Sequence, residues 1–337
     1  MPKLIARPEV LRHNLAVMRE ACARTKASCL FVFKEAPLHP ELTASILDGC
    51  RFDRLGVMAW PEAGLDRLGS AELHHVYSPS PMLMKDAAFC QTVYLSSRFS
   101  LERLAEYCGP KKPSLRLTLE CGDGRDGIHE DEIEELAALA VRYGFPLRGL
   151  SLNFACLSQK PPTLEALHYA ERVLGALRRF SPEADISAGG TDVLELADTC
   201  PLPPSVREIR CGTGVMLGLY PLSGRPIPQA RQDAFRLEAC ILELRVKDGR
   251  RMALLDLGSF HTAPEHLIAP LPAMRFCGAS SGYSVFDVTD CDARLTEGMV
   301  LRFSLDYKAL ARALTSQALP FVFARTEHDG CSEDNYA

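Results

Sequence analysis

From residue 7 to residue 214 the chain alternates between short apolar runs and segments with helical spacing. The apolar runs indicate strands, because they are short and rich in β-branched and aromatic residues. Near-continuous apolar strands that alternate with helices predict a parallel sheet covered on both faces. Eight such units over about two hundred residues favour an α/β fold of the (β/α)8 TIM-type barrel class. The eight runs are residues 29–34, 54–59, 74–79, 92–97, 115–122, 147–154, 184–190 and 208–214.

The pattern changes after a stretch rich in Pro, Gly and Arg, "GLYPLSGRPIPQARQDAF". The next segment, "RLEACILELRVKDGRRMALLDLGS", has the pattern of two strands joined by a turn at "KDGR". We therefore expect a barrel domain at residues 7–222 and a smaller, mainly β C-terminal domain at residues 223–327. Residues 1–6 would join the second domain, and residues 328–337 would form a polar tail.

Composition excludes several classes of partner. The 337 residues are 47% hydrophobic and carry a formal net charge of -5, so nothing favours binding to nucleic acid or an anionic membrane. No run of eighteen apolar residues predicts a membrane span, and "MPKLIARPEV" lacks a signal-peptide core. Thirteen cysteines without a C-x-x-C spacing are better explained as small buried hydrophobic residues than as metal ligands or disulfides. We expect a cytoplasmic protein with no metal site.

Candidate functional residues follow from the barrel prediction, since active sites of such barrels lie at the C-terminal ends of the strands. Lys34 ends the first strand, Arg125 lies in the loop after the fifth, and Asn153 ends the sixth. The last two strands end in glycine-rich loops, a pattern that favours backbone N–H groups around an anion. Either loop alone is more often only a turn, but the two together predict a phosphorylated ligand. These loops contain Gly189, Gly190 and Thr191, and Arg210, Gly212 and Thr213.

Lys34 narrows the choice of ligand. An isolated lysine at a strand end commonly reaches solvent, whereas a desolvated one can form a Schiff base. Pyridoxal 5'-phosphate (PLP) has an aldehyde for such a lysine, a phosphate for the glycine loops and a ring nitrogen that needs a protein partner. Arg210, facing inward from the eighth strand, would supply that partner.

Several motifs in the expected order resemble the fold-type III PLP enzymes of the alanine racemase superfamily, above all the ornithine racemase-like branch. They extend from about residue 30 to residue 312. The branch's Asp-His pair after "GASS" is replaced here by Gly282 and Tyr283. The motifs are "FVFK" ending at Lys34, "ECGDGRDG", "GLSLNFAC", "ISAGGT", "IRCG", "GASSGY" and "LDYKAL".

The resemblance implies a role for each candidate. Lys34 would hold PLP covalently and act as one acid/base catalyst, and Arg210 would face the pyridine nitrogen without giving up a proton. Arg125 would lie near the phenolic oxygen of the ring, and Asn153 against its face. The phosphate would be held by Thr191 with the backbone of Gly189, Gly212 and Thr213.

Racemisation removes a proton from one face of Cα and returns one on the other, so it needs a second base. In alanine racemases this base is a tyrosine from the partner subunit, and the resemblance therefore implies a homodimer with the active site at the subunit interface. Tyr283 and His261 are the candidates here, with Tyr283 preferred, although either would equally serve as a structural residue. Tyr307 would reach the phosphate or belong to the core.

The sequence thus predicts a PLP-dependent amino-acid racemase acting on a free amino acid such as ornithine. Two alternatives remain open. One is a fold-type III decarboxylase or aldolase-type lyase, and the other is a non-catalytic PLP-binding protein.

Overall fold

The computed structural model describes residues 1–47, 54–58 and 71–324. Within this part the chain divides into two compact units. The first, the barrel unit, is Arg12–Ala230, and the second, the β unit, combines Met1–Leu11 with the described residues from Arg231 onward. The polar tail predicted at residues 328–337 lies outside the described residues, and the boundary expected after residue 222 stays a prediction.

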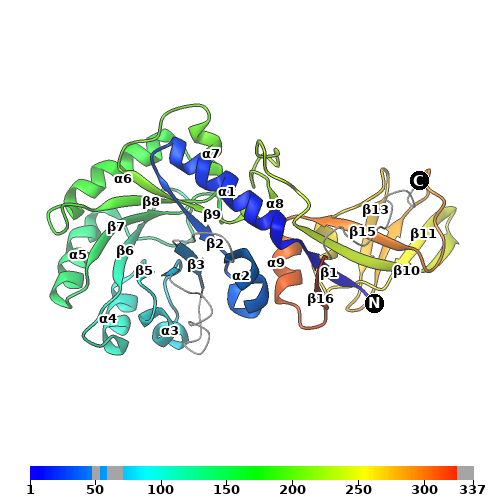
Figure 1. Ribbon diagram of the computed structural model, residues 1–337, viewed down its shortest axis with the longest axis horizontal. Helices are drawn as coiled ribbons and strands as arrows, with labels where there is room; N and C mark the ends of the chain where they lie inside the picture. Colours follow the sequence, from blue (N-terminus) through cyan, green and yellow to red (C-terminus); the bar gives the residue numbers. More distant parts are fainter. Residues whose placement is uncertain (48–53, 59–70, 325–337) are drawn as a thin grey trace. The chain divides into compact units, whose positions relative to one another are not determined.

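The barrel unit contains a closed barrel of eight strands, each hydrogen-bonded in parallel to its neighbours (Figure 1). Each predicted strand segment overlaps one of them, which confirms the (β/α)8 prediction. The strands are β2 (Ser28–Val32), β3 (Arg54–Val57), β4 (Glu72–His75), β5 (Thr92–Leu95), β6 (Ser114–Leu119), β7 (Leu147–Leu152), β8 (Asp185–Gly189) and β9 (Val206–Cys211).

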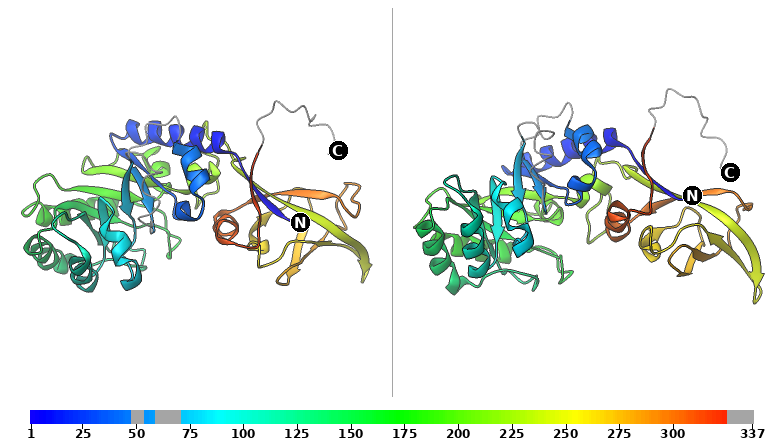
Figure 2. Two further views of the ribbon diagram at one scale, coloured as in Figure 1. Left: turned by 60° about the horizontal axis from the view of Figure 1, so that its bottom comes forward. Right: turned by 90° about the horizontal axis from the view of Figure 1, so that it is seen from below.

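Helices connect the barrel strands and lie outside them (Figure 2). Local capping fixes where two of them begin, because the hydroxyls of Ser97 and Thr163 accept N–H groups of the first turns of α4 and α6. The helices are α1 (Pro8–Arg24), α2 (Pro40–Leu47), α3 (Met84–Ala88), α4 (Arg98–Tyr107), α5 (Ile133–Arg142), α6 (Leu164–Leu177), α7 (Asp192–Ala197) and α8 (Thr213–Leu217), with short 3-10 turns at Ala36–Leu38, Pro81–Leu83 and Glu130–Glu132.

The interior of the barrel contains a buried polar network in addition to aliphatic side chains. Glu208 on β9 is fully buried and accepts a hydrogen bond of 2.9 Å from the Tyr94 hydroxyl. Its carboxylate also lies 3.5 Å from the Arg116 guanidinium and 3.3 Å from that of Arg54. A buried charge is tolerated only when it is paired and hydrogen-bonded, so these partners hold one another in place.

The same network sets the pKa values of two carboxylates. A hydrogen bond from His74, followed by the charge of Arg148, lowers the pKa of Glu72 to about 2. Burial on its own would raise the pKa of Glu208, but the nearby charges of Arg116 and His74 outweigh it and hold that pKa well below its usual range. Both groups are therefore ionised in the folded protein down to strongly acidic pH.

Acid should consequently destabilise the fold. In the unfolded chain both carboxylates regain an ordinary pKa near 4.5. Their contribution is thus fully present above that pH and is lost as the pH falls toward 2. We expect urea denaturation to give a free energy of unfolding about 2 kcal/mol lower at pH 3.5 than at pH 7. Glu72→Gln should show a clearly smaller drop, and equal drops in variant and wild type would contradict this assignment.

In its described residues the β unit is a mainly antiparallel sheet with the helix α9 (Tyr307–Thr315) and a 3-10 turn at Pro264–His266. The path of the sheet runs β12-β15-β10-β11-β14-β13, and β1 pairs antiparallel with β10 and parallel with β16. Asp248 and Gly249 have positive φ angles of 52° and 76°, as the tight turn between β10 and β11 requires. The strands are β1 (Lys3–Ala6), β10 (Phe235–Lys247), β11 (Arg250–Leu255), β12 (Leu267–Ile268), β13 (Arg275–Ala279), β14 (Ser284–Asp287), β15 (Val300–Leu305) and β16 (Phe321–Phe323).

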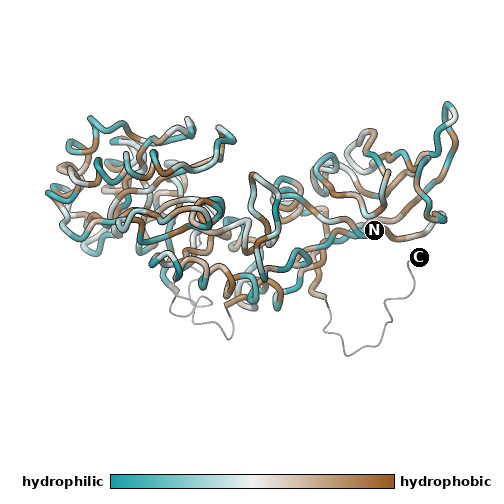
Figure 3. The backbone as a smooth tube through the Cα atoms, turned by 90° about the horizontal axis from the view of Figure 1, so that it is seen from above, coloured by the Kyte–Doolittle hydropathy of each residue, from teal (hydrophilic) through white to brown (hydrophobic). Residues whose placement is uncertain are grey.

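Hydrophobic and hydrophilic stretches alternate along the chain in both units (Figure 3). Among the described residues, no helix combines the length and the apolar character needed to cross a membrane.

Candidate active site

Lys34 lies at the mouth of the barrel. The hydroxyl of Ser28 accepts a hydrogen bond from Arg54 in the barrel interior, so alternate residues of β2 face inward. Pairing with the next strand continues to Phe33, whose N–H donates to Gly56. Lys34, just beyond the C-terminal end of β2, therefore continues the series of inward-facing positions. Its Nζ lies 5.0 Å from the centroid of the Tyr77 ring.

Arg125 is presented by a tightly folded loop after β6. The Glu120 carboxylate accepts the N–H groups of Gly122 and Gly124, which closes the loop on itself. Gly127 has a φ of +143°, and a Cβ there would lie 2.5 Å from the Glu120 nitrogen, so only glycine fits. The loop places the Arg125 guanidinium 5.4 Å from the centroid of the same Tyr77 ring. Two cations thus share one aromatic ring at the barrel mouth.

A chain of hydrogen bonds joins this loop to Arg210. One oxygen of Asp126 accepts from Arg125 at 2.8 Å and from the Asn153 amide at 3.0 Å. The side-chain amide oxygen (Oδ1) of Asn153 in turn accepts a hydrogen bond from Nη2 of Arg210 at 2.8 Å. The side chains of Arg125, Asn153 and Arg210, which follow or end three different strands, are therefore brought together as the barrel prediction requires.

Arg210 is almost fully buried, and its guanidinium lies 5.2 Å from the centroid of the Tyr94 ring. Besides Asn153 it donates to the carbonyl and hydroxyl oxygens of Ser187 and to the carbonyl oxygen of Leu152. All of these acceptors are neutral, so within the described residues its hydrogen bonds involve no carboxylate. The positive charge of Arg210 is held in place and left available to a ligand.

The two glycine-rich loops meet beside Arg210. A Cβ on Gly189 would lie only 2.3 Å from Nη2 of Arg210, and one on Gly212 would lie 3.2 Å from the Val32 carbonyl oxygen. The Thr191 hydroxyl accepts the Gly214 N–H at 3.0 Å, which joins the two loops and leaves its own O–H as a donor. Gly190 precedes Thr191, and Thr213 begins α8.

These residues fit PLP on the structure alone. A side chain at Gly189 or Gly212 would crowd Arg210 or the Val32 carbonyl oxygen, so the backbone at both loops is free of side chains, as an anion site requires. Lys34 and Arg125 add cations at the same mouth, and Arg210 offers a guanidinium bonded only to neutral acceptors. An aldehyde, a phosphate and a ring nitrogen would each find a chemically matched group.

The remaining candidates belong to the β unit. Tyr283 precedes β14 and is 52% exposed, and Tyr307 is the first residue of α9. The Nδ1 atom of His261 accepts the Gly258 N–H at 3.0 Å. Burial lowers the pKa of His261, so its ring is neutral at pH 7 and carries its proton on Nε2.

His261 and Tyr283 lie on adjacent loops of this unit. The N–H groups of Ser259 and Phe260 donate to the carbonyl oxygens of Ser280 and Ser281 at 2.9 Å each. The loops that carry His261 and Tyr283 are therefore held next to each other in the β unit.

Tyr77 was not predicted from the sequence. It lies in the predicted strand segment 74–79, where an aromatic residue is as compatible with the core as with a site. Its position two residues beyond β4 was the available signal, because strand ends line the mouth of a barrel.

Removing the Tyr77 ring should loosen the two cations beside it. We expect Tyr77→Leu to weaken PLP binding about 2- to 10-fold, since each cation–π contact contributes about 0.5–1 kcal/mol. Tyr77→Phe keeps the ring and should bind PLP nearly as the wild type does. Titration of the apoprotein with PLP measures both, and equal weakening in the two variants would show that the hydroxyl matters rather than the ring.

Comparisons with known proteins find two racemases with similar sequences. The chain is 25% identical to an ornithine racemase from Acetoanaerobium sticklandii over 233 residues, 61% of this chain and 66% of that protein. It is also 25% identical to a lysine racemase from Thermotoga maritima over 269 residues, 71% of this chain and 73% of that one. The aligned region thus spans about two thirds of the ornithine racemase.

Solved structures share the fold. An alanine racemase from Corynebacterium glutamicum matches with a TM-score of 0.74 and 17% identity, covering 96% of this chain and 99% of that one. An alanine racemase from Bartonella henselae with covalently bound pyridoxal phosphate matches with a TM-score of 0.69 and 13% identity, at the same coverage. The sequence model described as "Alanine racemase, N-terminal domain" matches residues 7–221. Because this match includes more than half of the chain and all of the barrel strands, the chain belongs to the alanine racemase N-terminal domain family.

Proposed function

We propose that this protein is a PLP-dependent racemase of a free amino acid. The observation that carries the proposal is the arrangement at the barrel mouth, where Lys34 and Arg125 flank Tyr77 and a hydrogen-bond chain leads on to Arg210. Family membership and the two racemase relatives support the same reaction class.

Each residue of the mouth would hold one part of the cofactor. Lys34 would bond the aldehyde carbon, Arg210 would face the ring nitrogen, Arg125 would face the phenolic oxygen, and Asn153 would lie against the ring. The phosphate would be held by Gly189, Gly190, Thr191, Gly212 and Thr213. When bound, PLP supplies an electron sink that makes the Cα–H bond of an amino acid acidic.

The protein's own groups then direct the proton. The Lys34 amine would take the Cα proton on one face and return it in the reverse direction. Arg210 would donate hydrogen bonds without releasing a proton, because a guanidinium stays protonated in proteins. Its neutral, fixed acceptors prevent it from shifting toward a substrate carboxylate.

A second group is needed on the opposite face. We propose Tyr283, with His261 beside it as the alternative, and a homodimer in which the partner's β unit completes the site. Tyr307 would assist at the phosphate. Tyr283→Phe should then reduce racemisation about 100-fold or more while PLP binding persists, as for the loss of one general base. The same loss in His261→Asn with Tyr283→Phe near wild type would reassign the base to His261.

The substrate class follows from the relatives' names. Ornithine and lysine carry a second, cationic amine, so we propose a basic amino acid as substrate. A cytoplasmic location is part of the proposal, and the eleven described cysteines, all free thiols, support a reducing compartment.

Product analysis tests the proposed reaction. The PLP-loaded protein is incubated separately with L-ornithine, L-lysine, L-alanine and a hydroxyamino acid such as threonine, and the products are separated by chiral chromatography. We expect the D-enantiomer of a basic amino acid to accumulate until both forms are about equal. Release of CO₂ with an amine would instead identify a decarboxylase, and cleavage to glycine and an aldehyde from a hydroxyamino acid would identify a lyase. Bound PLP without turnover of any amino acid would leave a carrier role.

A further inference from the structure

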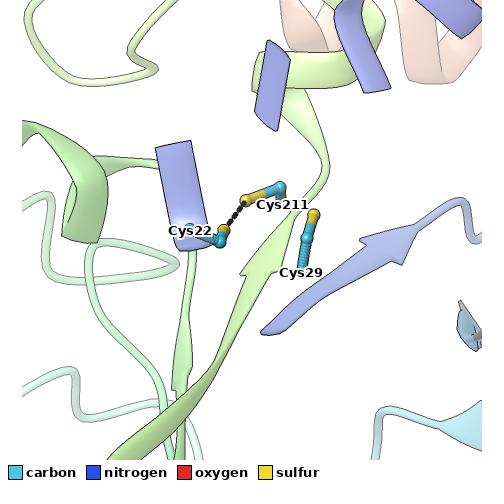
Figure 4. Close-up of side chains that lie close together, drawn as sticks. All are labelled: Cys22, Cys29 and Cys211. Carbon is cyan, nitrogen blue, oxygen red and sulfur yellow. Dashed lines mark hydrogen bonds between the residues drawn. The ribbon is translucent and has the colours of Figure 1, made fainter. Parts of the chain in front are cut away.

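Three cysteine thiols from distant parts of the sequence converge outside the barrel. Cys22 lies on α1, Cys29 on β2 and Cys211 at the end of β9, and their side chains project into one space (Figure 4). The sulfur atoms of Cys22 and Cys211 are 3.9 Å apart, and all three lie within 4.8 Å of one another. We call these three residues the cysteine cluster.

The strand register explains why they meet. Phe31 on β2 pairs with Cys211 on β9, so Cys29 lies two residues earlier on the same face. Arg210 and Glu208 face the barrel interior, which places Cys211 on the outer face, where it meets Cys22 of α1. Three separate elements thus each contribute one thiol to a common point.

The spacing suits a bound ion. Two thiolates on one Zn²⁺ at about 2.3 Å lie about 3.8 Å apart at tetrahedral angles. The sulfur of Cys22 is already at this distance from that of Cys211, and the third needs to move by less than about 1 Å. We propose that the cysteine cluster binds a thiophilic d10 cation of the Zn²⁺ or Cu⁺ class as a three-thiolate site.

The charge around the cluster is also compatible with a bound cation. Three thiolates with a divalent cation carry a net charge of -1. Two arginines of α1 lie near the cluster, Arg24 near Cys22 and Arg19 near Cys29. Their positive charges offset part of this negative charge.

The burial of the cluster is also suitable. Cys22 and Cys211 are fully buried, which protects a metal–thiolate bond from water, and Cys29 is of intermediate exposure. Cys211 directly precedes Gly212, and Cys29 shares a strand with the segment that ends at Lys34. An ion would therefore tie α1 to both strands that frame the proposed PLP site, although the metal site does not depend on the proposed function.

Cadmium titration of the reduced protein tests the site, because Cd²⁺ bound by thiolates absorbs in the near ultraviolet. We expect one equivalent to bind with a sulfur-to-metal charge-transfer band, and Zn²⁺ to displace it. Cys22→Ala, Cys29→Ala and Cys211→Ala should each weaken Cd²⁺ binding by more than the roughly 10- to 100-fold that loss of an outer-shell partner costs. The metal should also raise the Tm of the wild type and not that of the variants.

Cys90→Ala is the matched control, since Cys90 is equally buried but lies outside the cluster. It should bind Cd²⁺ as the wild type does, and the triple variant lacking all three thiols gives the background from the other cysteines. If alanine at the buried position 22 or 211 prevents folding, the Cys29→Ala variant alone still tests the site. Equal Cd²⁺ binding by the wild type and Cys29→Ala, or no charge-transfer band at one equivalent, would overturn the proposal.

Discussion

Replacing Lys34 with alanine should abolish racemisation, with turnover about 10⁴-fold or more below the wild type. The amine would both hold the cofactor covalently and move the Cα proton. Removal of a group with such a role causes some of the largest decreases in turnover seen for single substitutions in enzymes. Lys34 lies two residues beyond β2, with its Nζ 5.0 Å from the Tyr77 ring centroid. Chiral chromatography of initial rates gives the comparison.

The visible absorption of the PLP-treated protein provides a second readout. The wild type should show a Schiff-base band that borohydride abolishes, and Lys34→Ala should lack it. Lys85→Ala is the matched control, because Lys85 is an exposed lysine on helix α3, and its loss should leave the band and the rate unchanged. A borohydride-sensitive band that persists in Lys34→Ala would assign the cofactor to another lysine.

Gly189→Ala should damage the site and the fold together. The added Cβ would lie 2.3 Å from Nη2 and 2.8 Å from Cζ of Arg210. The guanidinium cannot retreat cheaply, because it donates to Ser187, Leu152 and Asn153 from a buried position. We expect a loss of about 1–3 kcal/mol in the free energy of unfolding, as for overpacked cores, and a PLP affinity at least about 10-fold weaker.

Urea denaturation and PLP titration measure these two losses. Gly175→Ala is the control, since a Cβ at this position in the last turn of α6 meets nothing within 4 Å. It should raise the free energy of unfolding by about 0.5–1 kcal/mol through helix propensity. A Gly189→Ala protein with wild-type stability and PLP affinity would show that Arg210 is not held as described.

The barrel could be predicted because its strands are short, nearly continuous apolar runs separated by helical periodicity. The rule that strand ends line the barrel mouth then placed Lys34, Arg125, Asn153 and Arg210 together, as the structure does. Several short elements of the β unit were not predicted. The strands β12 and β16 have two and three residues, too few to show alternation, and α9 begins two residues after β15 ends.

Contacts between residues far apart in the sequence were the main feature that could not be predicted. Glu208 and Arg116 sit within apolar runs, and only closure of the barrel shows that they lie 3.5 Å apart. Tyr77 gave no periodic signal, and its role depends on two cations from other loops. The cysteine cluster has no local spacing signature, because Cys211 reaches Cys22 and Cys29 through the pairing of the first and last barrel strands.

Proton exchange in D₂O tests the central claim most directly. The PLP-loaded protein is incubated with L-ornithine in D₂O, and the recovered amino acid is analysed by mass spectrometry after chiral separation. We expect the D-enantiomer to form and to carry one deuterium at Cα. The proton removed from one face is replaced on the other face by a base whose own proton has exchanged with D₂O. If only unlabelled L-ornithine is recovered, and the same experiment with L-lysine gives only unlabelled L-lysine, the protein is not a racemase of basic amino acids.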